Sequence, residues 1–191
     1  LKYRYLHCRL DGGRTKEINL LEAAGFYLTD IGVHWEAKTS ADGMAPNIKT
    51  AAEDDIPHLK TLCRGLFGHS RFYHDPFFRQ DADRFFAAWV ENSVAGKAAD
   101  TVFFIKGAGV VTLRKLKGGR GDIPLIGVVE NKRGKGHGKA LIGAAMHWFK
   151  GMKVETVKTR TQLRNIQAMN FYHSAGFRIT GFDVIMGRAL R

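Results

Sequence analysis

Three glycines at every second position, Gly134, Gly136 and Gly138, precede a run of residues with helical periodicity. They follow an apolar segment that ends in Val128 and Val129, so the order is strand, glycine loop and helix. Glycine lets main-chain N–H groups approach an anion closely, and a helix N-terminus adds a partial positive charge. This order is typical of a phosphate-binding loop; the plain alternative is a glycine-rich surface turn with a solvated basic face.

Two common phosphate loops do not fit this spacing. A dinucleotide-binding loop requires Gly-x-Gly-x-x-Gly and an acidic residue at a strand end about 20 residues further on. A Walker A loop requires four residues between its first glycine and Gly-Lys-Ser/Thr. The segment RGKGHGK, residues 133–139, satisfies neither pattern. The loop therefore belongs to neither of these two classes of nucleotide site.

A second pattern lies further along the chain, in the segment NIQAMNFYHSAGF, residues 165–177. Asn165 is a good N-cap and Gly176 a good C-cap, so the segment predicts a helix. Tyr172 and Phe171 lie in one stripe of this helix, and such a stripe usually packs into a core.

Together, the two segments resemble the signature of the GNAT acetyltransferases. The family's pyrophosphate loop has Arg or Gln, two residues, Gly, one residue, and Gly or Ala, which fits Arg133 to Gly138. A later helix of the family has the pattern Asn-x-x-Ala-x-x-Phe/Leu-Tyr-x-x-x-Gly-Phe, which fits residues 165–177. The resemblance covers residues 48–191 and implies an N-acetyltransferase that uses acetyl-CoA.

The resemblance also implies where acetyl-CoA lies. The pantetheine arm would pair, like an added strand, with the strand that ends at Val129, where this strand diverges from the segment VETVKTRT, residues 154–161. The pyrophosphate would lie on the amides of the glycine loop, and no metal is implied. The residues that the resemblance assigns to acetyl-CoA are Val128, Val129, Arg133, Gly134, Lys135, Gly136, His137, Gly138, Lys139 and Asn165.

The resemblance gives Tyr172 a catalytic role. When an amine attacks the thioester, the tetrahedral intermediate expels a CoA thiolate, and a nearby hydroxyl can protonate this thiolate as a general acid. The alternative is that Tyr172 is one more core aromatic.

The reaction also needs a base, which has one proton to remove from the amine. Asp30 is the candidate base, and His69, His74 and Asp75 stay open as others.

A finer resemblance concerns the acceptor. Residues 69–96 and 20–33 are similar to parts of the sugar-nucleotide N-acetyltransferases that act on dTDP-4-amino-4,6-dideoxyhexoses. This implies an anionic amino-sugar nucleotide as the partner, whose pyrophosphate an arginine would bind in a bidentate manner. Another amine, such as a protein N-terminus, an antibiotic or a small metabolite, is the alternative. The residues assigned to the acceptor are Arg71, Phe72, Tyr73, His74 and Asp75, with Arg79, Arg84 and Arg114 as further arginines.

The elements that must position these residues predict an α/β fold, a mixed twisted sheet with helices on both faces. Residues 1–38 form a small N-terminal α/β unit, interpreted as a truncated GNAT-like half, residues 39–47 a linker, and residues 48–191 the acetyltransferase domain. Periodicity predicts helices over 15–25, 53–68, 81–96, 140–149 and 165–176, and strands over 2–10, 26–38, 48–52, 101–107, 109–116, 122–129, 154–161, 177–182 and 184–190.

The composition is that of an ordinary globular chain, with 191 residues of which 45% are hydrophobic. The net charge of +12 predicts anionic partners, but no recognition-helix or RNA-binding motif favours nucleic acid. No apolar run approaches the ~20 residues of a membrane span, and the first residues lack the apolar core of a signal peptide. Two cysteines without metal-ligand spacing, Cys8 and Cys63, fit a reducing compartment, so we expect a cytoplasmic location. A homodimer is possible.

Overall fold

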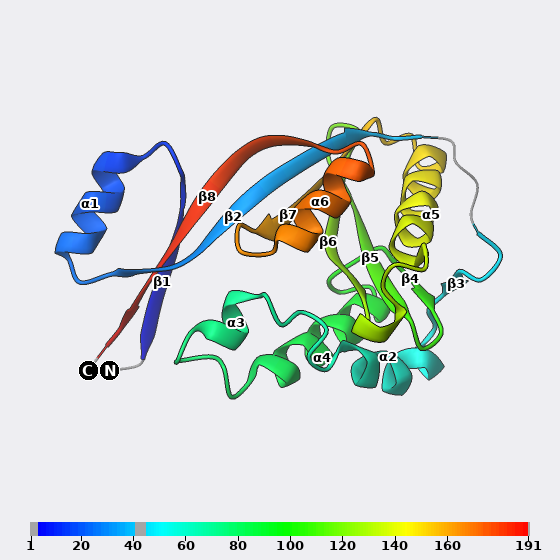
Figure 1. The fold of residues 1–191 in the computed structure, drawn as a ribbon, viewed down its shortest axis with the longest axis horizontal. Coiled ribbons are helices and arrows are strands. Elements are labelled where there is room, and N and C mark those ends of the chain that lie inside the picture. Colours follow the sequence, from blue (N-terminus) through cyan, green and yellow to red (C-terminus); the bar gives the residue numbers. More distant parts are fainter. Residues whose placement is uncertain (1–3, 41–44, 191) are drawn as a thin grey trace.

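The computed structural model describes residues 4–40 and 45–190. These residues form one mixed sheet of eight strands in the order β1-β8-β2-β7-β6-β5-β4-β3 (Figure 1). Every neighbouring pair is antiparallel except β6 and β7, which are parallel. The strands are β1 (Tyr5–Asp11), β2 (Tyr27–Lys38), β3 (Lys49–Thr50), β4 (Thr101–Ile105), β5 (Gly109–Leu116), β6 (Arg120–Val128), β7 (Thr156–Gln162) and β8 (Arg178–Ala189).

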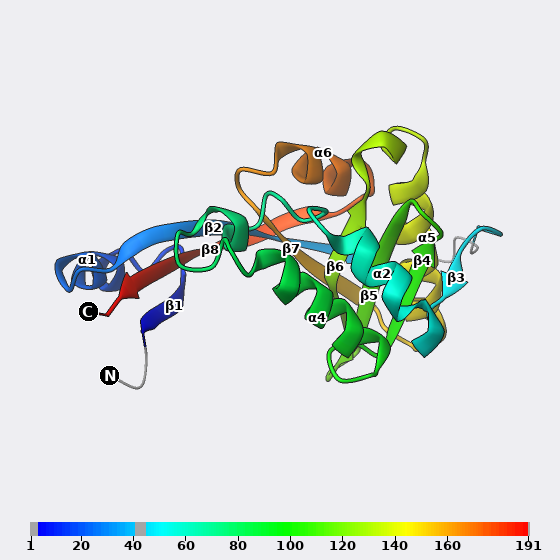
Figure 2. The ribbon, with the colours of Figure 1, turned by 90° about the horizontal axis from the view of Figure 1, so that it is seen from below.

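Helices cover both faces of the central strands, and this confirms the predicted fold class. Helices α2 and α4 cross in front of the central strands in Figure 2, and α5 and α6 pack against the opposite face. The helices are α1 (Thr15–Ala23), α2 (Ile56–Cys63), α3 (Arg71–His74), α4 (Ala82–Val94), α5 (His137–Gly151) and α6 (Ile166–Ser174), with 3-10 turns η1 (Glu53–Asp55) and η2 (Glu130–Lys132).

The two hydrophobic clusters follow from the alternation of side chains along the strands. In β4, Val102 and Phe104 join the cluster beneath α2 and α4, whereas Phe103 and Ile105 join the cluster beneath α5 and α6. All four side chains are buried, because a central strand covered on both faces has no solvated side. The central sheet is therefore a rigid support for the strand ends next to it.

Two long strands, β2 and β8, extend from the central sheet into an arm at the left of Figure 1, where β1 and α1 lie. Strand β2 pairs with both β7 and β8, so it belongs to the same sheet as the later strands. The division into a unit of residues 1–38 and a domain of residues 48–191 stays a prediction. Of the predicted linker, residues 41–44 lie outside the described residues.

Two of the predicted element boundaries were wrong. The strands predicted at 177–182 and 184–190 form one strand, β8, because Gly181 lies at a bulge opposite His34 and does not end the strand. The helix predicted over 53–68 is a 3-10 turn followed by α2, which ends at Cys63 because Arg64 is extended and Gly65 has φ +66°. The short helix α3 was not predicted.

Candidate active site

Strands β6 and β7 separate along their length and form a wedge. They pair only from Arg120 to Ile123 on β6 and from Thr156 to Thr159 on β7. The next residue of β6, Pro124, has no N–H to donate, and here β6 places two residues opposite Leu113 of β5, the arrangement of a β-bulge. The wedge therefore begins at the Ile123–Thr159 rung and opens toward the C-terminal end of β6.

The edge of β6 that faces the wedge carries main-chain groups that no neighbouring strand pairs with. The N–H of Leu125 donates to the Thr112 hydroxyl at 3.1 Å, and the N–H of Val129 donates to the Ala108 carbonyl at 2.8 Å, so these odd-numbered residues face β5. Because successive residues of a strand point their main-chain groups to opposite edges, those of Ile126 and Val128 face the wedge. An extended chain with amide groups can pair with this edge as an added strand.

The glycine loop, residues 133–138, connects β6 to α5, and its three glycines serve two purposes. Gly134 and Gly136 have φ +73° and +79°, which an L residue rarely adopts, and Gly136 is the N-cap of α5. A Cβ on Gly138 would lie 3.1 Å from the Phe171 ring, so this glycine allows α5 to approach α6 closely. The loop main chain thus turns directly into the N-terminus of a helix, where an anion is favoured.

Polar side chains fix the loop to its surroundings. Arg133 donates from Nε to the Val128 carbonyl at 3.0 Å and from Nη1 to Gln167 Oε1 at 3.2 Å. Asn165 caps α6 as predicted, because its Oδ1 accepts the N–H of Ala168 at 3.1 Å. The side chains of Lys135 and Lys139 are exposed, so both place positive charge near the loop while staying solvated.

Tyr172 lies at the narrow end of the wedge. Its hydroxyl lies 3.4 Å from the Thr159 hydroxyl, which donates to the Ile123 carbonyl at 3.0 Å across the last rung. The residue is 4% exposed and packs against Trp35 and Phe177. Burial raises the pKa of Tyr172 to about 12, against the effect of the Thr159 hydrogen bond, so the phenol keeps its proton at neutral pH.

A cluster of charged side chains lies on the opposite face of the sheet from Tyr172. Asp183 of β8 accepts Arg160 Nη2 at 2.6 Å and Nε at 2.9 Å, and it contacts His34 Nε2 at 2.7 Å. Burial would raise the pKa of Asp183, but the hydrogen bonds from Arg160 and His34 hold it below its ordinary value. Gly32 makes this possible, because a Cβ there would occupy the Arg160 guanidinium position.

Two buried charged groups near this cluster lack a hydrogen-bond partner among the described residues. These atoms are Nη1 of Arg71, on α3, and Oδ2 of Asp30, on β2. Arg160 Nη2 lies 3.9 Å from Asp30 Oδ2. Burial raises the pKa of Asp30, opposed mainly by Arg160 and Arg164. Buried polar groups are normally paired, so a ligand group between α3 and the sheet would satisfy these two.

The other residues predicted for the acceptor are engaged within the protein. The Phe72 ring centroid lies 4.1 Å from that of Phe85, and the Tyr73 hydroxyl donates to Asp83 Oδ1 at 2.6 Å. His74 Nε2 lies 2.9 Å from the Gly68 carbonyl, and Asp75 accepts the Tyr5 hydroxyl at 2.6 Å. Of residues 71–75, Arg71 therefore has the unpaired group, and the others hold α3 against α4 and β1.

Sequence reasoning missed His34, Arg160 and Asp183. Each lies in a strand, where a polar residue at every second position is ordinary. The available signal was the segment DIGVH of β2, which places a carboxylate, a glycine and an imidazole on one face of an otherwise apolar strand.

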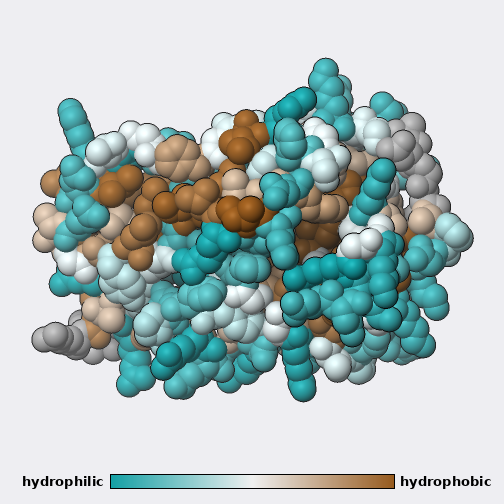
Figure 3. Space-filling view, in the orientation of Figure 1, coloured by the Kyte–Doolittle hydropathy of each residue, from teal (hydrophilic) through white to brown (hydrophobic). Residues whose placement is uncertain are grey.

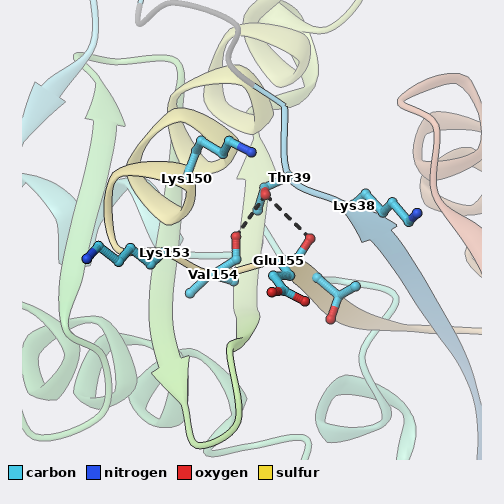
Figure 4. Close-up of a pocket in the computed structure, with 7 residues that line it drawn as sticks. Lys38, Thr39, Lys150, Lys153, Val154 and Glu155 are labelled. Atoms are coloured by element: carbon cyan, nitrogen blue, oxygen red, sulfur yellow. Dashed lines mark hydrogen bonds between the residues drawn. The ribbon is translucent and has the colours of Figure 1, made fainter.

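A hollow of about 510 Å³ lies at the other end of β7 from the wide end of the wedge. Figure 4 shows that the ammonium group of Lys153 points away from those of Lys38 and Lys150 and that the three do not meet at one point. The Thr39 hydroxyl donates to the Val154 carbonyl at 2.8 Å, inside this hollow (Figure 4). Because the lysines do not converge, the hollow is a weaker candidate than the wedge.

The donor set in the wedge fits acetyl-CoA on three observations. The edge of β6 beyond Ile123 is not paired with β7, the glycine loop precedes a helix N-terminus, and a protonated tyrosine lies at the narrow end. Within residues 4–40 and 45–190, no three His, Cys, Asp or Glu side chains gather as a metal site. Over the same residues, no helix has the length and apolar character needed to cross a membrane.

Comparisons with known proteins agree with this geometry. The chain is 28% identical over 182 residues to the dTDP-fucosamine acetyltransferase of Escherichia coli, covering 91% of this chain and 77% of the relative. It is 30% identical over 128 residues to the spore coat polysaccharide biosynthesis protein SpsD of Bacillus subtilis, covering 64% of this chain and 44% of the relative.

Solved structures share the fold. A GCN5-related N-acetyltransferase from Sphaerobacter thermophilus aligns with TM-score 0.68 and 16% identity over 98% of this chain and 60% of the solved one. PaiA N-acetyltransferase from Thermoplasma acidophilum, in complex with coenzyme A, aligns with TM-score 0.58 and 15% identity over 75% of this chain and 98% of the solved one. The acetyltransferase (GNAT) family matches residues 55–177, so the chain belongs to this family of acetyltransferases.

Proposed function

We propose that this acetyltransferase transfers the acetyl group of acetyl-CoA to the amine of a nucleotide-linked amino sugar, a dTDP-4-amino-4,6-dideoxyhexose. The observation that carries the acceptor assignment is Arg71, a buried arginine whose Nη1 has no partner among the described residues. A guanidinium binds a pyrophosphate in a bidentate manner. The names of the two relatives support a role in polysaccharide biosynthesis.

For the donor, we propose that the pantetheine arm pairs with the free edge of β6 at Ile126 and Val128, and that Val129 ends this edge. The pyrophosphate lies on the amides of residues 133–138, with positive charge from Arg133, Lys135 and Lys139. The Asn165 amide contacts the pantetheine arm while it caps α6. His137 contributes its main-chain N–H in the first turn of α5.

For the chemistry, we propose that Tyr172 protonates the leaving CoA thiolate. The C–N bond forms as the C–S bond breaks, and the sulfur takes the phenol proton. A phenol whose pKa is raised to about 12 carries the proton that this step needs at every physiological pH. The position of the hydroxyl at the last rung of β6 and β7 supports this role, because the thioester end of the donor would reach there.

For the acceptor, Arg71 is the proposed anion-binding residue. The cation stacks on the Phe72 ring at 4.3 Å, and Asp75 holds the end of α3 through Tyr5. Phe72, Tyr73 and His74 then shape the acceptor site through the packing of α3. Asp30 as the base stays a prediction from the sequence.

Three further assignments remain proposals. Both cysteines are free, as expected in a reducing compartment, which supports the cytoplasmic location. The homodimer and the two-part division of the chain rest on the sequence alone.

The test is release of CoA thiol with a panel of amines at equal concentration. The panel contains dTDP-4-amino-4,6-dideoxygalactose, the same sugar without the nucleotide, a peptide with a free N-terminus, and an aminoglycoside. We expect turnover with the dTDP-sugar and at least about tenfold lower kcat/KM with the free sugar, since a charged hydrogen bond contributes about 1.5–3 kcal/mol. Turnover confined to the peptide or the aminoglycoside would refute the sugar assignment.

A further inference from the structure

At the narrow end of the wedge between β6 and β7, Tyr172 lies on one face of the sheet and charged side chains lie on the other. Tyr172 lies on the α6 face, at the Ile123–Thr159 rung. We place the acceptor amine on the opposite face, so that the acid and the base act from different sides of the thioester carbon. That face carries the charged cluster of Arg160, Asp183 and His34. The group that removes the proton from the amine must therefore be sought there, near the same rung.

Strand register places His34 next to that rung. Trp35 of β2 pairs with Thr159, and the neighbouring His34 pairs with Arg160. Asp30 lies further along β2, five residues from Trp35. At about 3.3 Å per residue this is about 16 Å along the strand. His34 is one residue from the rung and Asp30 is five, so His34 is the nearer of the two along β2.

The hydrogen bonding of His34 is that of a positioned base. Its Nε2 lies 2.7 Å from Oδ2 of Asp183, a residue that is 2% exposed. A carboxylate accepts, so the neutral ring carries its proton on Nε2 and leaves the Nδ1 lone pair free. The side chain is 45% exposed, so the ring can meet a bound acceptor or a water between them. Arg160, bidentate to Asp183, keeps that carboxylate in place.

We propose that Nδ1 of His34 takes the proton from the acceptor ammonium, directly or through a water, and that Asp183 is its positioning residue. This rests on the proposed N-acetyltransferase reaction. The ammonium gives one proton to His34, and the neutral amine then forms the C–N bond. As the C–S bond breaks, Tyr172 protonates the sulfur; the nitrogen then loses its second proton to solvent, and the phenolate takes a proton from solvent once the products leave. The imidazolium returns its proton to solvent after each turnover.

The surrounding charges come from several elements. Asp183 on β8 contacts the His34 ring, and Arg160 on β7 contacts Asp183. Arg9 on β1 lies 3.6 Å from Asp183, and Asp30 and Arg71 lie further along the same face.

The test is the pH dependence of kcat/KM for His34→Gln, with whichever amine the wild-type protein acetylates. At pH 7 we expect a loss of about 100-fold, a typical contribution of general base catalysis. The ratio of wild type to variant should shrink as pH rises toward the pKa of the amine, because the amine then loses its proton unaided. The acetyl-CoA Kd and the melting temperature should not change. In His34→Ala, added imidazole should restore part of the rate.

The matched control is His147→Gln, on the exposed face of α5, which should behave as wild type at every pH. A wild-type-to-variant ratio that is constant with pH, or unchanged turnover of His34→Gln, would overturn the assignment of His34. Acetylation of an amine other than the sugar nucleotide would instead count against the proposed acceptor alone.

Discussion

The proposed donor side and the proposed acceptor side of the wedge rely on different parts of the polypeptide. The donor side is main chain: the free edge of β6, the glycine loop and the N-terminus of α5. The acceptor side is side chain, with Arg71, His34, Arg160 and Asp183 brought together from one helix and three strands. Figure 3 shows hydrophobic residues gathered in a band across the upper half of the face seen in Figure 1, with mostly hydrophilic residues below it.

This difference indicates which part of the site can change in sequence while the fold is kept. A site made of main chain depends on conformation, so it requires proline and glycine at fixed places, such as Pro124, Gly134 and Gly136. A site made of side chains depends on residue type, so its residues can change while the fold stays. The donor is then common to a family, and the acceptor is particular to each member.

Tyr172 lies between the two sides, and of the substitutions proposed, removal of its hydroxyl should have the largest effect on kcat. In Tyr172→Phe we expect kcat to fall by about 10²–10⁴-fold, because the thiolate loses its acid. The acetyl-CoA Kd should stay within a factor of about two, since the ring keeps its packing. The measurement is steady-state thiol release together with titration of acetyl-CoA. Tyr27→Phe, which removes a hydroxyl on the exposed part of β2, is the control. Unchanged turnover of Tyr172→Phe would return this residue to a core role.

Arg71 tests the acceptor side alone. In Arg71→Met we expect the acceptor KM to rise by about 10–100-fold, as for the loss of a charged hydrogen bond of about 1.5–3 kcal/mol, with the acetyl-CoA Kd unchanged. Arg71→Lys should not restore binding, because an ammonium lacks the bidentate fork. The control is Arg84→Met, since Arg84 is solvated on α4. An equal rise in KM for Arg84→Met, or weaker acetyl-CoA binding in Arg71→Met, would mean that the two sides are not separate.

The backbone conformation of the proposed donor side could be predicted from the sequence, because it depends on residues close together in the chain. The glycine loop, the start of α5 and the Asn165 cap of α6 lie within a short stretch and carry residues chosen for backbone conformation. The mixed sheet with helices on both faces was also predicted, because apolar periodicity marks each element.

The residues of the proposed acceptor side could not be predicted together from the sequence, because they lie on strands far apart in the chain. The meeting of His34, Arg160 and Asp183 depends on the strand order β8-β2-β7, which no local pattern encodes. For the aromatic residues near Arg71 the error was different: the sequence suggested a ligand contact where the structure has internal packing. Phe72 was predicted to contact the acceptor, but its ring packs on Phe85 of α4. Composition cannot separate an aromatic residue that binds a ligand from one that fills a core.

The most direct test of the central claim, that main-chain conformation holds acetyl-CoA, compares two glycines. Gly136→Ala and Gly118→Ala place an L residue at φ +79° and +72°, and neither added Cβ meets an atom within 4 Å. Each substitution should lower stability by about 1–2 kcal/mol, because both positions are left-handed. The measurement is the acetyl-CoA Kd of both variants by titration calorimetry. We expect about tenfold weaker binding, or about 1.4 kcal/mol, in Gly136→Ala alone. Wild-type affinity in Gly136→Ala, or an equal loss in Gly118→Ala at the far β5–β6 turn, would contradict the claim.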